Sequence, residues 1–474
     1  MLTTAKEILK EINFLGYEAY IVGGAVRDYS MQKPLHDIDI ATNAPFDVLK
    51  SHFHTLCDIS KNMNVWVYLL EKNGFKFEIA NFRMHTVTQN RNCPEATNCI
   101  HSFKDDASRR DFTINAMGMD YHGNIIDFFG GKKDIENHII RTVGNPFDRF
   151  DEDFIRILRA VRFASRYTFH LDTATADAIS ACGECLLQLS PERIQTELAK
   201  MAGEGGKPFA NAIVLMRELN VLRFILPEVD ILFDLPHSDT HHPEGVCKNS
   251  QCKNFANYTA NHAFCNTCPN AFNSVGKHVA ETLRVCSSND IYQLFALLFH
   301  DIGKGITYLP LEKNGEIKHT YYRHDTASKE VITAIAKRLK WSHKLTEIVI
   351  FCAKNHMILH QAIKIKPYTL LTLMENKYFS YAVETSFCDD KARCGLFKQE
   401  EWDKLLAYLD DFRNTFFAFS RHITGKHIME ITGIQQGIRL GKILKAVKKH
   451  AANHKILDTE TLDKTIRFYE KCIK

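Results

Sequence analysis

The sequence predicts an α+β protein, in which a head with a mixed β-sheet precedes an all-helical body. In the first 150 residues, short runs of β-type residues alternate with helical stretches. From Asp151 onward, the periodicity of amphipathic helices dominates. The expected strands cover residues 20–22, 38–40, 65–70 and 75–79.

The chain has 474 residues, of which 45% are hydrophobic, and it is too long for a single core. Residues 236–276 are polar and rich in Asn, which predicts an insertion between helices, with a Cys-rich part at 246–276. We therefore expect four parts: a head (1–150), a helical neck (151–235), a helical domain with the insertion (236–400) and a helical tail (401–474).

Composition excludes some classes of protein. The formal net charge of +4 is too small to indicate nucleic-acid binding by itself, so any basic surface has to be local. No apolar run reaches the length of a membrane span, and residues 1–10 lack a signal-peptide core, so we expect a cytoplasmic protein without membrane contact. The fourteen cysteines are scattered, which predicts mostly reduced thiols.

Two carboxylates, Asp37 and Asp39, follow a glycine-containing turn at residues 22–28. Residues two apart on a strand point to the same face, so both carboxylates would enter one site. Like charges held together need a cation, and oxygen-only ligands favour Mg²⁺, which completes its shell with water and phosphates. The sequence therefore predicts nucleotidyl transfer, and a solvated strand edge is the structural alternative.

The glycine turn itself suits a triphosphate. Gly23 and Gly24 carry no Cβ, so their N–H groups can approach phosphate oxygens, and Arg27 offers a planar fork for the same oxygens. Glu78, on a neighbouring expected strand, is a third acid that could orient or deprotonate the attacking hydroxyl. An ordinary exposed strand residue is the alternative for Glu78.

Two further charged motifs follow. Arg109, Arg110 and Asp111 lead into a run ending in Ala-Met-Gly-Met, which predicts a helix beside the site, although a surface ion-pair cluster would look alike. Within residues 151–163, charged and apolar side chains form two parallel stripes on an expected helix, so the charged stripe would face an anion or form internal ion pairs. The charged stripe consists of Asp153, Arg156, Arg159 and Arg162.

An Asp beside an Arg can also distinguish bases. Cytosine and adenine each present an exocyclic amine donor beside a ring-nitrogen acceptor, which an Asp acceptor and an Arg donor complement. Uracil and guanine present a carbonyl beside a ring N–H, so the same pair would oppose them.

These motifs together resemble the bacterial class II tRNA nucleotidyltransferases, the CCA-adding enzymes, which are related to bacterial poly(A) polymerases. The resemblance runs from the glycine turn to the tail and implies a polymerase-β-like head. It implies template-independent addition of C, C and A to the tRNA 3′ end from CTP and ATP, with release of pyrophosphate and no obligate protein partner. It implies base selection by Asp153 and Arg156, a contact of Asp111 with the primer sugar or the metal site, and nucleotide contacts from Gly24, Arg27, Arg110, Arg159 and Arg162.

Related activities share this head. Poly(A) polymerases of the family usually carry an arginine-rich stretch soon after the acidic strand, whereas residues 57–65 contain one lysine and no arginine, which favours CCA addition. Enzymes that add only CC or only A remain alternatives. The polar segment 84–101 matches the position of the loop associated with switching from C to A, which favours the complete reaction.

A second candidate site begins where the apolar run 294–299 ends. His300 and Asp301, with His278 upstream and Asp389 or Asp390 downstream, can supply nitrogen and oxygen ligands to a transition metal. This pattern resembles the HD phosphohydrolase domain of some CCA-adding enzymes. It implies a metal-dependent phosphohydrolase or 2′,3′-cyclic phosphodiesterase acting on RNA ends, and an idle scaffold is the alternative. Further ligand positions of such domains correspond to His324 and His356.

The insertion carries four cysteines in two close pairs, which suit a tetrahedral Zn²⁺. They are Cys247, Cys252, Cys265 and Cys268. A small polar segment would gain its fold from such an ion, with His262 as a spare ligand; chance clustering is the alternative. Cys182 and Cys185 lack a partner pair and are expected to be helix residues.

Positive charge is concentrated in the tail. Between residues 421 and 455, eight Lys or Arg residues accompany a single acid, Glu430. Lysines and glycine turns suit the backbone of a duplex RNA, and the segment resembles the family's C-terminal tail, which holds the tRNA elbow. The expected tRNA contacts are Lys442, Lys445 and Lys448, and a solvated helix face is the alternative.

Overall fold

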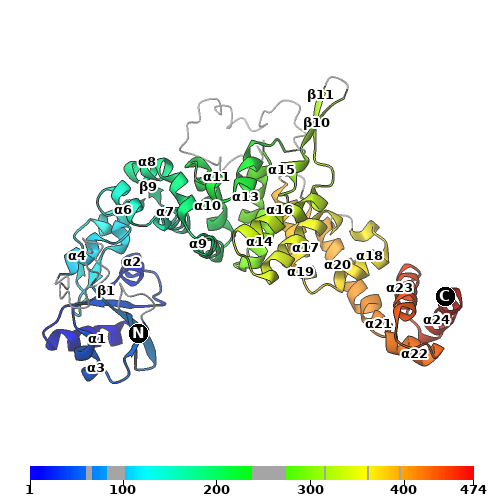
Figure 1. Ribbon diagram of the computed structural model, residues 1–474, viewed down its shortest axis with the longest axis horizontal. Coiled ribbons are helices and arrows are strands. Elements are labelled where there is room, and N and C mark those ends of the chain that lie inside the picture. The colour runs from blue at the N-terminus through cyan, green and yellow to red at the C-terminus, as the bar shows by residue number, and fades with distance from the viewer. Residues whose placement is uncertain are drawn as a thin grey trace. The chain divides into compact units, whose positions relative to one another are not determined.

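Figure 1 shows the computed structural model of the protein. The described chain forms two compact units: Met1–Met201 with Asn211–Ile225, and Ala202–Ala210 with Leu226–Lys474. The structure describes residues 1–59, 67–82, 102–237, 274–313, 316–359, 362–393 and 397–473.

The head contains a seven-stranded sheet in the order β3-β4-β5-β2-β1-β6-β7. β2 and β5 run parallel, and the other neighbouring strands run antiparallel. This mixed sheet, followed by a helical remainder, confirms the predicted fold class. The strands are β1 (Ala19–Val22), β2 (Asp39–Thr42), β3 (Cys57–Asp58), β4 (Val67–Lys72), β5 (Phe75–Asn81), β6 (Gly118–Met119) and β7 (Ile125–Ile126).

Helices flank and extend this sheet. In α1, buried residues recur every three or four positions, and this face packs on β1. A small parallel sheet joins β8 (Ile139–Ile140) to β9 (His170–Leu171). The helices up to residue 225 are α1 (Leu2–Phe14), α2 (Gly24–Ser30), α3 (Phe46–His52), α4 (Phe103–Ser108), α5 (Gly131–Glu136), α6 (Pro146–Glu152), α7 (Ile155–Tyr167), α8 (Thr173–Ala181), α9 (Pro191–Gly203), α10 (Gly206–Glu218) and α11 (Leu222–Ile225), with 3₁₀ turns η1 (Thr113–Asn115) and η2 (Gly183–Gln188).

Some expected elements differ from the structure. The run after Asp111 is not a helix but the turn η1 followed by β6, because Gly118 pairs with β1 and leaves no room for a Cβ against Phe103. Asp153 is not part of a helix: it lies between α6 and α7, where its Oδ1 accepts the N–H of Ile155 at 3.3 Å. Cys182 lies in the turn between α8 and η2, and Cys185 lies inside the 3₁₀ helix η2.

In its described residues, the second unit is helical apart from one hairpin. Its elements are η3 (Ile231–Asp234), α12 (Pro227–Asp230), α13 (Val275–Val285), α14 (Ile291–Phe299), α15 (Lys304–Thr307), β10 (Leu309–Lys313), β11 (Glu316–Thr320), α16 (His324–Arg338), α17 (His343–Leu359), η6 (Ala362–Lys364), α18 (Pro367–Met374), α19 (Phe379–Ala392), α20 (Gln399–Phe412), η7 (Arg413–Phe417), α21 (Ala418–Ser420), α22 (Gly425–Thr432), α23 (Ile438–Asn453) and α24 (Thr459–Cys472). α14 lies among α13, α17 and α19, and seven of its nine residues are buried. α13 begins at Val275, so the expected insertion ends before residue 276.

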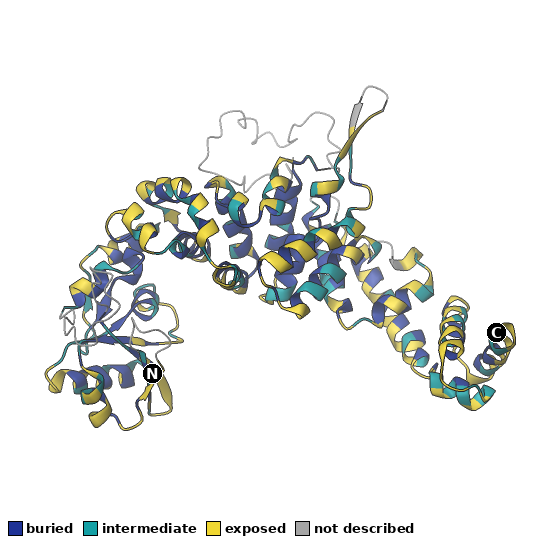
Figure 2. Ribbon diagram, viewed as in Figure 1, coloured by how far each residue is buried: buried dark blue, intermediate teal, exposed yellow. Residues whose placement is uncertain are grey.

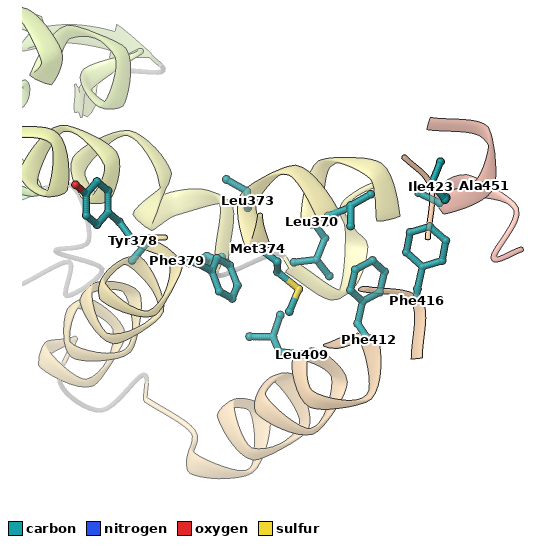
Figure 3. Close-up of a cluster of buried hydrophobic side chains, with 14 of the residues drawn as sticks. Leu370, Leu373, Met374, Tyr378, Phe379, Leu409, Phe412, Phe416, Ile423 and Ala451 are labelled. Carbon is teal, nitrogen blue, oxygen red and sulfur yellow. The ribbon is translucent and has the colours of Figure 1, made fainter. Parts of the chain in front are cut away.

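Most helices of this unit have one buried and one exposed face, as Figure 2 shows. A continuous apolar cluster joins α18 and α20 to the tail helices. In Figure 3, the side chains of Met374, Leu409 and Phe412 point toward one another, and the cluster continues through Phe416 to Ile423. This core holds the tail to the rest of the second unit.

Candidate active sites

Asp37 and Asp39 are exposed, whereas Ile38 and Ile40 are 1% and 0% exposed. Asp39 begins β2 and Asp37 lies two residues before this strand, so the buried Ile38 separates two exposed carboxylates; the parallel register sets Glu78 opposite Asp39. Partial loss of hydration, together with the charges of Glu78 and Asp37, raises the pKa of Asp39, while a nearby arginine opposes this effect. A cation bound between the carboxylates would relieve this repulsion.

A pocket of about 1000 Å³ lies beside these carboxylates in the first unit. Glu78 is absent from the described residues that line it, whereas Asp111, Arg193 and Lys200 belong to the lining. Its lining includes every other nucleotide-site residue expected from the sequence: Gly24, Arg27, Asp37, Asp39, Arg110, Asp153, Arg156, Arg159 and Arg162.

The glycine turn forms one wall of this pocket. Gly23 has φ +67°, a conformation that favours glycine, and a Cβ there would lie 3.3 Å from Nη1 of Arg110. Arg27 is 5% exposed: it pairs with Asp28 at 2.9 Å and donates from Nη1 to Asn115 Oδ1 at 2.7 Å. These contacts hold the Arg27 guanidinium in one position, so it places a positive charge in the pocket wall.

The second charged motif is joined to α7 by an ion pair between the buried Asp111 and the half-buried Arg159. Asp111 Oδ2 accepts from Arg159 Nη2 at 2.6 Å, and Asp111 Oδ1 accepts from Asn115 and from the N–H of Phe112. Burial favours the neutral acid, but Arg159 and these hydrogen bonds outweigh it and hold the pKa of Asp111 below its usual value. Asp111 therefore stays ionised in the pocket wall.

The two expected base-selecting residues have separate partners. The Asp153 carboxylate accepts from Nη2 of Arg193 at 2.9 and 2.7 Å. Arg156 donates from Nη1 to Glu152 at 2.6 Å and from Nη2 to the carbonyl of Arg109 at 3.1 Å. Both side chains line the pocket, but they do not pair with each other.

Sequence reasoning missed the contribution of α9. Arg193 and Lys200 of this helix line the pocket. Glu197 is 3% exposed and accepts from Arg162 at 2.8 Å and from Lys200 at 2.9 Å. The available signal was the spacing of charged residues along one face of α9.

The second candidate site is a buried cluster in the second unit. His278, His300 and Asp301 gather with Asp389, whose Oδ1 lies 2.8 Å from His278 Nε2. Asp390 instead accepts from the indole of Trp402 at 2.7 Å, so Asp389 is the acid of the two that contacts His278. Asp301, His324 and His356 form a second group of possible ligands.

The carboxylates of this cluster attract positive charge. Burial disfavours ionised Asp301, but Lys304 and His300 hold its pKa well below the usual value. Burial likewise disfavours protonated His300, but Asp301 and Asp389 outweigh it and raise the pKa of His300. The same carboxylates would attract a metal ion, which would displace the proton from the ring nitrogen of a histidine that binds it.

The remaining expectations concern the tail, the cysteines and the membrane. Lys442 and Lys445 of α23 are exposed, whereas Lys448 pairs with Glu375 at 2.6 Å.

The described cysteines are free thiols, and no helix among the described residues is long and apolar enough to cross a membrane. Outside the described residues lie segment 84–101 and the expected zinc ligands Cys247, Cys252, Cys265 and Cys268.

Two family models match the first unit and its continuation. Residues 19–141 match the Poly A polymerase head domain. Residues 168–232 match the probable RNA and SrmB-binding site of polymerase A. The glycine turn, Asp37, Asp39 and Arg110 thus fall within the first match and most of the neck within the second, while residues 142–167 lie between the two matches.

Curated relatives are CCA-adding enzymes. The protein of Lactobacillus johnsonii is 43% identical over 213 residues, which are 45% of this chain and 53% of that protein. The protein of Enterococcus faecalis is 41% identical over 197 residues, which are 42% of this chain and 48% of that protein. The chain thus spans about half the length of the curated relatives it matches.

Solved structures match over nearly the whole chain. The CCA-adding enzyme of Bacillus stearothermophilus in complex with CTP has a TM-score of 0.61 and 24% identity, covering 99% of this chain and 98% of that one. The Thermotoga maritima CCA-adding enzyme complexed with tRNA has a TM-score of 0.59 and 19% identity, covering 98% and 94%. At these identities the likeness concerns the fold.

Proposed function

We propose that the protein adds C, C and A to the 3′ end of tRNA from CTP and ATP. The observation that carries this proposal is the placement of Asp37 and Asp39 beside a pocket that also contains Asp153 and Arg156. The similarity of about two fifths of the chain to CCA-adding enzymes supports the same activity.

The donor chemistry of the head fits Mg²⁺, since Asp37 and Asp39 offer exposed carboxylate oxygens on one face. When bound, Mg²⁺ supplies charge that stabilises the attacking and leaving oxygens. The primer 3′ oxygen attacks the α-phosphorus of the nucleotide, and the bond to pyrophosphate breaks. Glu78, opposite Asp39, is the candidate to orient the attacking hydroxyl or accept its proton.

The rest of the pocket would hold the nucleotide. Arg27 and Arg110 provide positive charge near the glycine turn, while Arg159 and Arg162 extend it along α7. Asp153 and Arg156 would read the base. Arg193 would hold the Asp153 carboxylate in place, while the remaining lone pairs of that carboxylate accept from the amine of cytosine or adenine.

The test uses tRNA that ends before its CCA, with Mg²⁺ and CTP, ATP or both. We expect growth by three nucleotides that stops there and needs both substrates. A long A ladder would instead identify a poly(A) polymerase, and a stop after two nucleotides, or addition of a single A to tRNA ending in CC, would identify a partial enzyme.

A second candidate function rests on the buried cluster around His300 and Asp301. The side chains of His278, His300 and Asp301, together with Asp389, offer mixed nitrogen and oxygen donors. Such a set fits a transition metal such as Mn²⁺ or Ni²⁺. We propose that this site hydrolyses phosphate esters at RNA ends. Conversion of a 2′,3′-cyclic phosphate, or release of phosphate from a 3′-phosphate, in the presence of these metals is the measurement.

A further inference from the structure

We propose that Cys286, Glu384 and Cys388 form a binding site for a zinc ion, with water as the fourth ligand. This inference goes beyond the two activities proposed above, because neither of them uses these three residues. The ion would join the end of α13 to α19 in the second unit.

The three side chains converge from two helices. Glu384 and Cys388 are four residues apart on α19, so they lie on the same face of that helix. Cys286 directly follows α13 and caps its C-terminal end. The two Sγ atoms and a carboxylate oxygen of Glu384 all lie within 4.8 Å of one another. Residues far apart in the sequence thus present three ligand atoms to one point.

The separation of these atoms suits a tetrahedral ion. With Zn–S at about 2.3 Å and Zn–O at about 2.0–2.2 Å, a sulfur and an oxygen on one tetrahedral Zn²⁺ lie about 3.5–3.7 Å apart. Sγ of Cys388 lies 3.5 Å from Oε1 of Glu384. Both thiols are buried, whereas Glu384 is half-buried, so water can reach the fourth position from the side of the carboxylate.

The donor types select the ion. Thiolates favour Zn²⁺, whereas Mg²⁺ and Mn²⁺ favour oxygen ligands. Cys286 accepts the N–H of Ser288, and the ammonium of Lys391 lies near it, which are surroundings that stabilise a thiolate. Two adjacent thiolates repel each other without a cation, so binding of Zn²⁺ would release the proton of the second thiol.

The charges balance when the ion is bound. Two thiolates and the carboxylate of Glu384 carry three negative charges, and Zn²⁺ supplies two positive ones. The charge of Lys391 offsets the remaining negative charge.

A metal-free polar contact is the alternative to this site. Cys388 can donate to Glu384, and Lys391 can balance one negative charge. Lys391 is exposed, however, and its Nζ lies 5.3 Å from the ring centroid of Phe387, so its charge is at the surface rather than among the three ligand atoms. A cation between these atoms would complete the cluster.

The site is separate from the His–Asp cluster of the second candidate site. Cys286 lies about 12 Å beyond His278 along α13, at about 1.5 Å per residue. On α19, Asp389 follows Cys388 directly, so their side chains leave the helix about 100° apart, and Asp389 contacts His278. The His–Asp cluster consists of His278, His300, Asp301, His324, His356 and Asp389.

The test compares the zinc content of full-length proteins kept reduced with a phosphine. Each protein is treated with a chelator, loaded with Zn²⁺, freed of excess metal and measured by elemental analysis. We expect Cys286→Ser/Cys388→Ser to hold one Zn²⁺ per chain less than the parent protein. Zinc bound elsewhere in the chain is common to both proteins and cancels in this difference. Loading with Co²⁺ instead should give a sulfur-to-cobalt charge-transfer band that is weaker in this variant.

Cys352→Ser is the matched control, because Cys352 is also a buried thiol of the second unit but lies on α17, outside this group. It should keep the zinc content of the parent protein. Glu384→Gln leaves both thiols and creates no cavity, should the double variant unfold. It should weaken the binding of one Zn²⁺ by about tenfold or more in competition with a chromophoric chelator, because a charged ligand becomes neutral.

Two results would overturn the site. One is an equal zinc content and an equal charge-transfer band in the parent protein and Cys286→Ser/Cys388→Ser. The other is a disulfide between Cys286 and Cys388, found by mass spectrometry in the zinc-loaded protein, because a disulfide leaves no thiolate to bind the ion.

Discussion

At the scale of single residues, the contact between Asp153 and Arg193 decides how the pocket would meet a base. The sequence indicated Asp153 through its place in a charged stripe, but Arg193 is forty residues later. Periodicity within one segment cannot predict a contact between two segments. The ion pair of Asp111 and Arg159 could not be predicted for the same reason, although each residue lay in a motif.

Arg193→Ala should weaken base selection more than nucleotide binding. Arg193 orients Asp153 through two hydrogen bonds, yet their side chains are 48% and 34% exposed, so the pair contributes about 1 kcal/mol or less. We expect misincorporation of UTP relative to CTP to rise by up to about fivefold, since 1 kcal/mol corresponds to that factor. Single-turnover incorporation with each nucleotide measures this ratio.

Arg193→Lys is the conservative control for that experiment. It keeps the charge but cannot reproduce the planar guanidinium contact, so it should fall between the parent protein and Arg193→Ala. Unchanged discrimination in Arg193→Ala, with an altered KM for every nucleotide alike, would show that Arg193 serves only the electrostatics of the pocket.

At the scale of elements, periodicity predicted the features that depend on one helix or strand by itself, and it failed where pairing with another element sets the structure. The two-residue period predicted the exposure of Asp37 and Asp39 on either side of the buried Ile38, although β2 begins only at Asp39. The run after Asp111 failed as a helix because pairing of β6 with β1 outweighed local preference. The predicted stripe on α7 loses Asp153, because the chain breaks between α6 and α7.

The tail helix α23 carries a testable charged stripe. Lys442, Lys445 and Lys449 are exposed on one face, with Ile443 and Val447 buried on the other. Changing the three lysines to Ala should weaken tRNA binding and lower the salt slope of log K by about 2–3, because each lysine would release about one counterion. Filter binding across salt concentrations measures the slope.

Lys448→Ala is the control within the same helix. Lys448 already pairs with Glu375, so its loss should change the slope less than the loss of an exposed lysine. The expected role of Lys448 in tRNA binding is therefore weaker than the sequence suggested. Equal affinity of the parent and triple-variant proteins at low and at high salt would remove α23 from the tRNA-binding surface.

At the scale of the whole molecule, the two candidate centres belong to different compact units. The pocket with Asp37 and Asp39 is built entirely from the first unit, and the His–Asp cluster entirely from the second. Sequence motifs pointed to both centres, and they named every residue of the His–Asp cluster, with Asp389 as one of two candidates. They could not predict how α13, α16, α17, α19 and the end of α14 bring these residues together.

Separate units predict separable activities. Asp37→Ala/Asp39→Ala should abolish nucleotide incorporation and spare phosphoester hydrolysis, because exposed carboxylates can be removed without disturbing a core. His300→Ala/Asp301→Ala should do the reverse, and Asp301→Asn repeats this change without creating a cavity. Both activities are measured on the same preparations, so the retained one reports on folding. Loss of both activities in either variant would mean that the centres depend on each other. If neither double variant lost an activity, neither centre would be catalytic, and the protein would be one that binds tRNA with these residues uninvolved in chemistry.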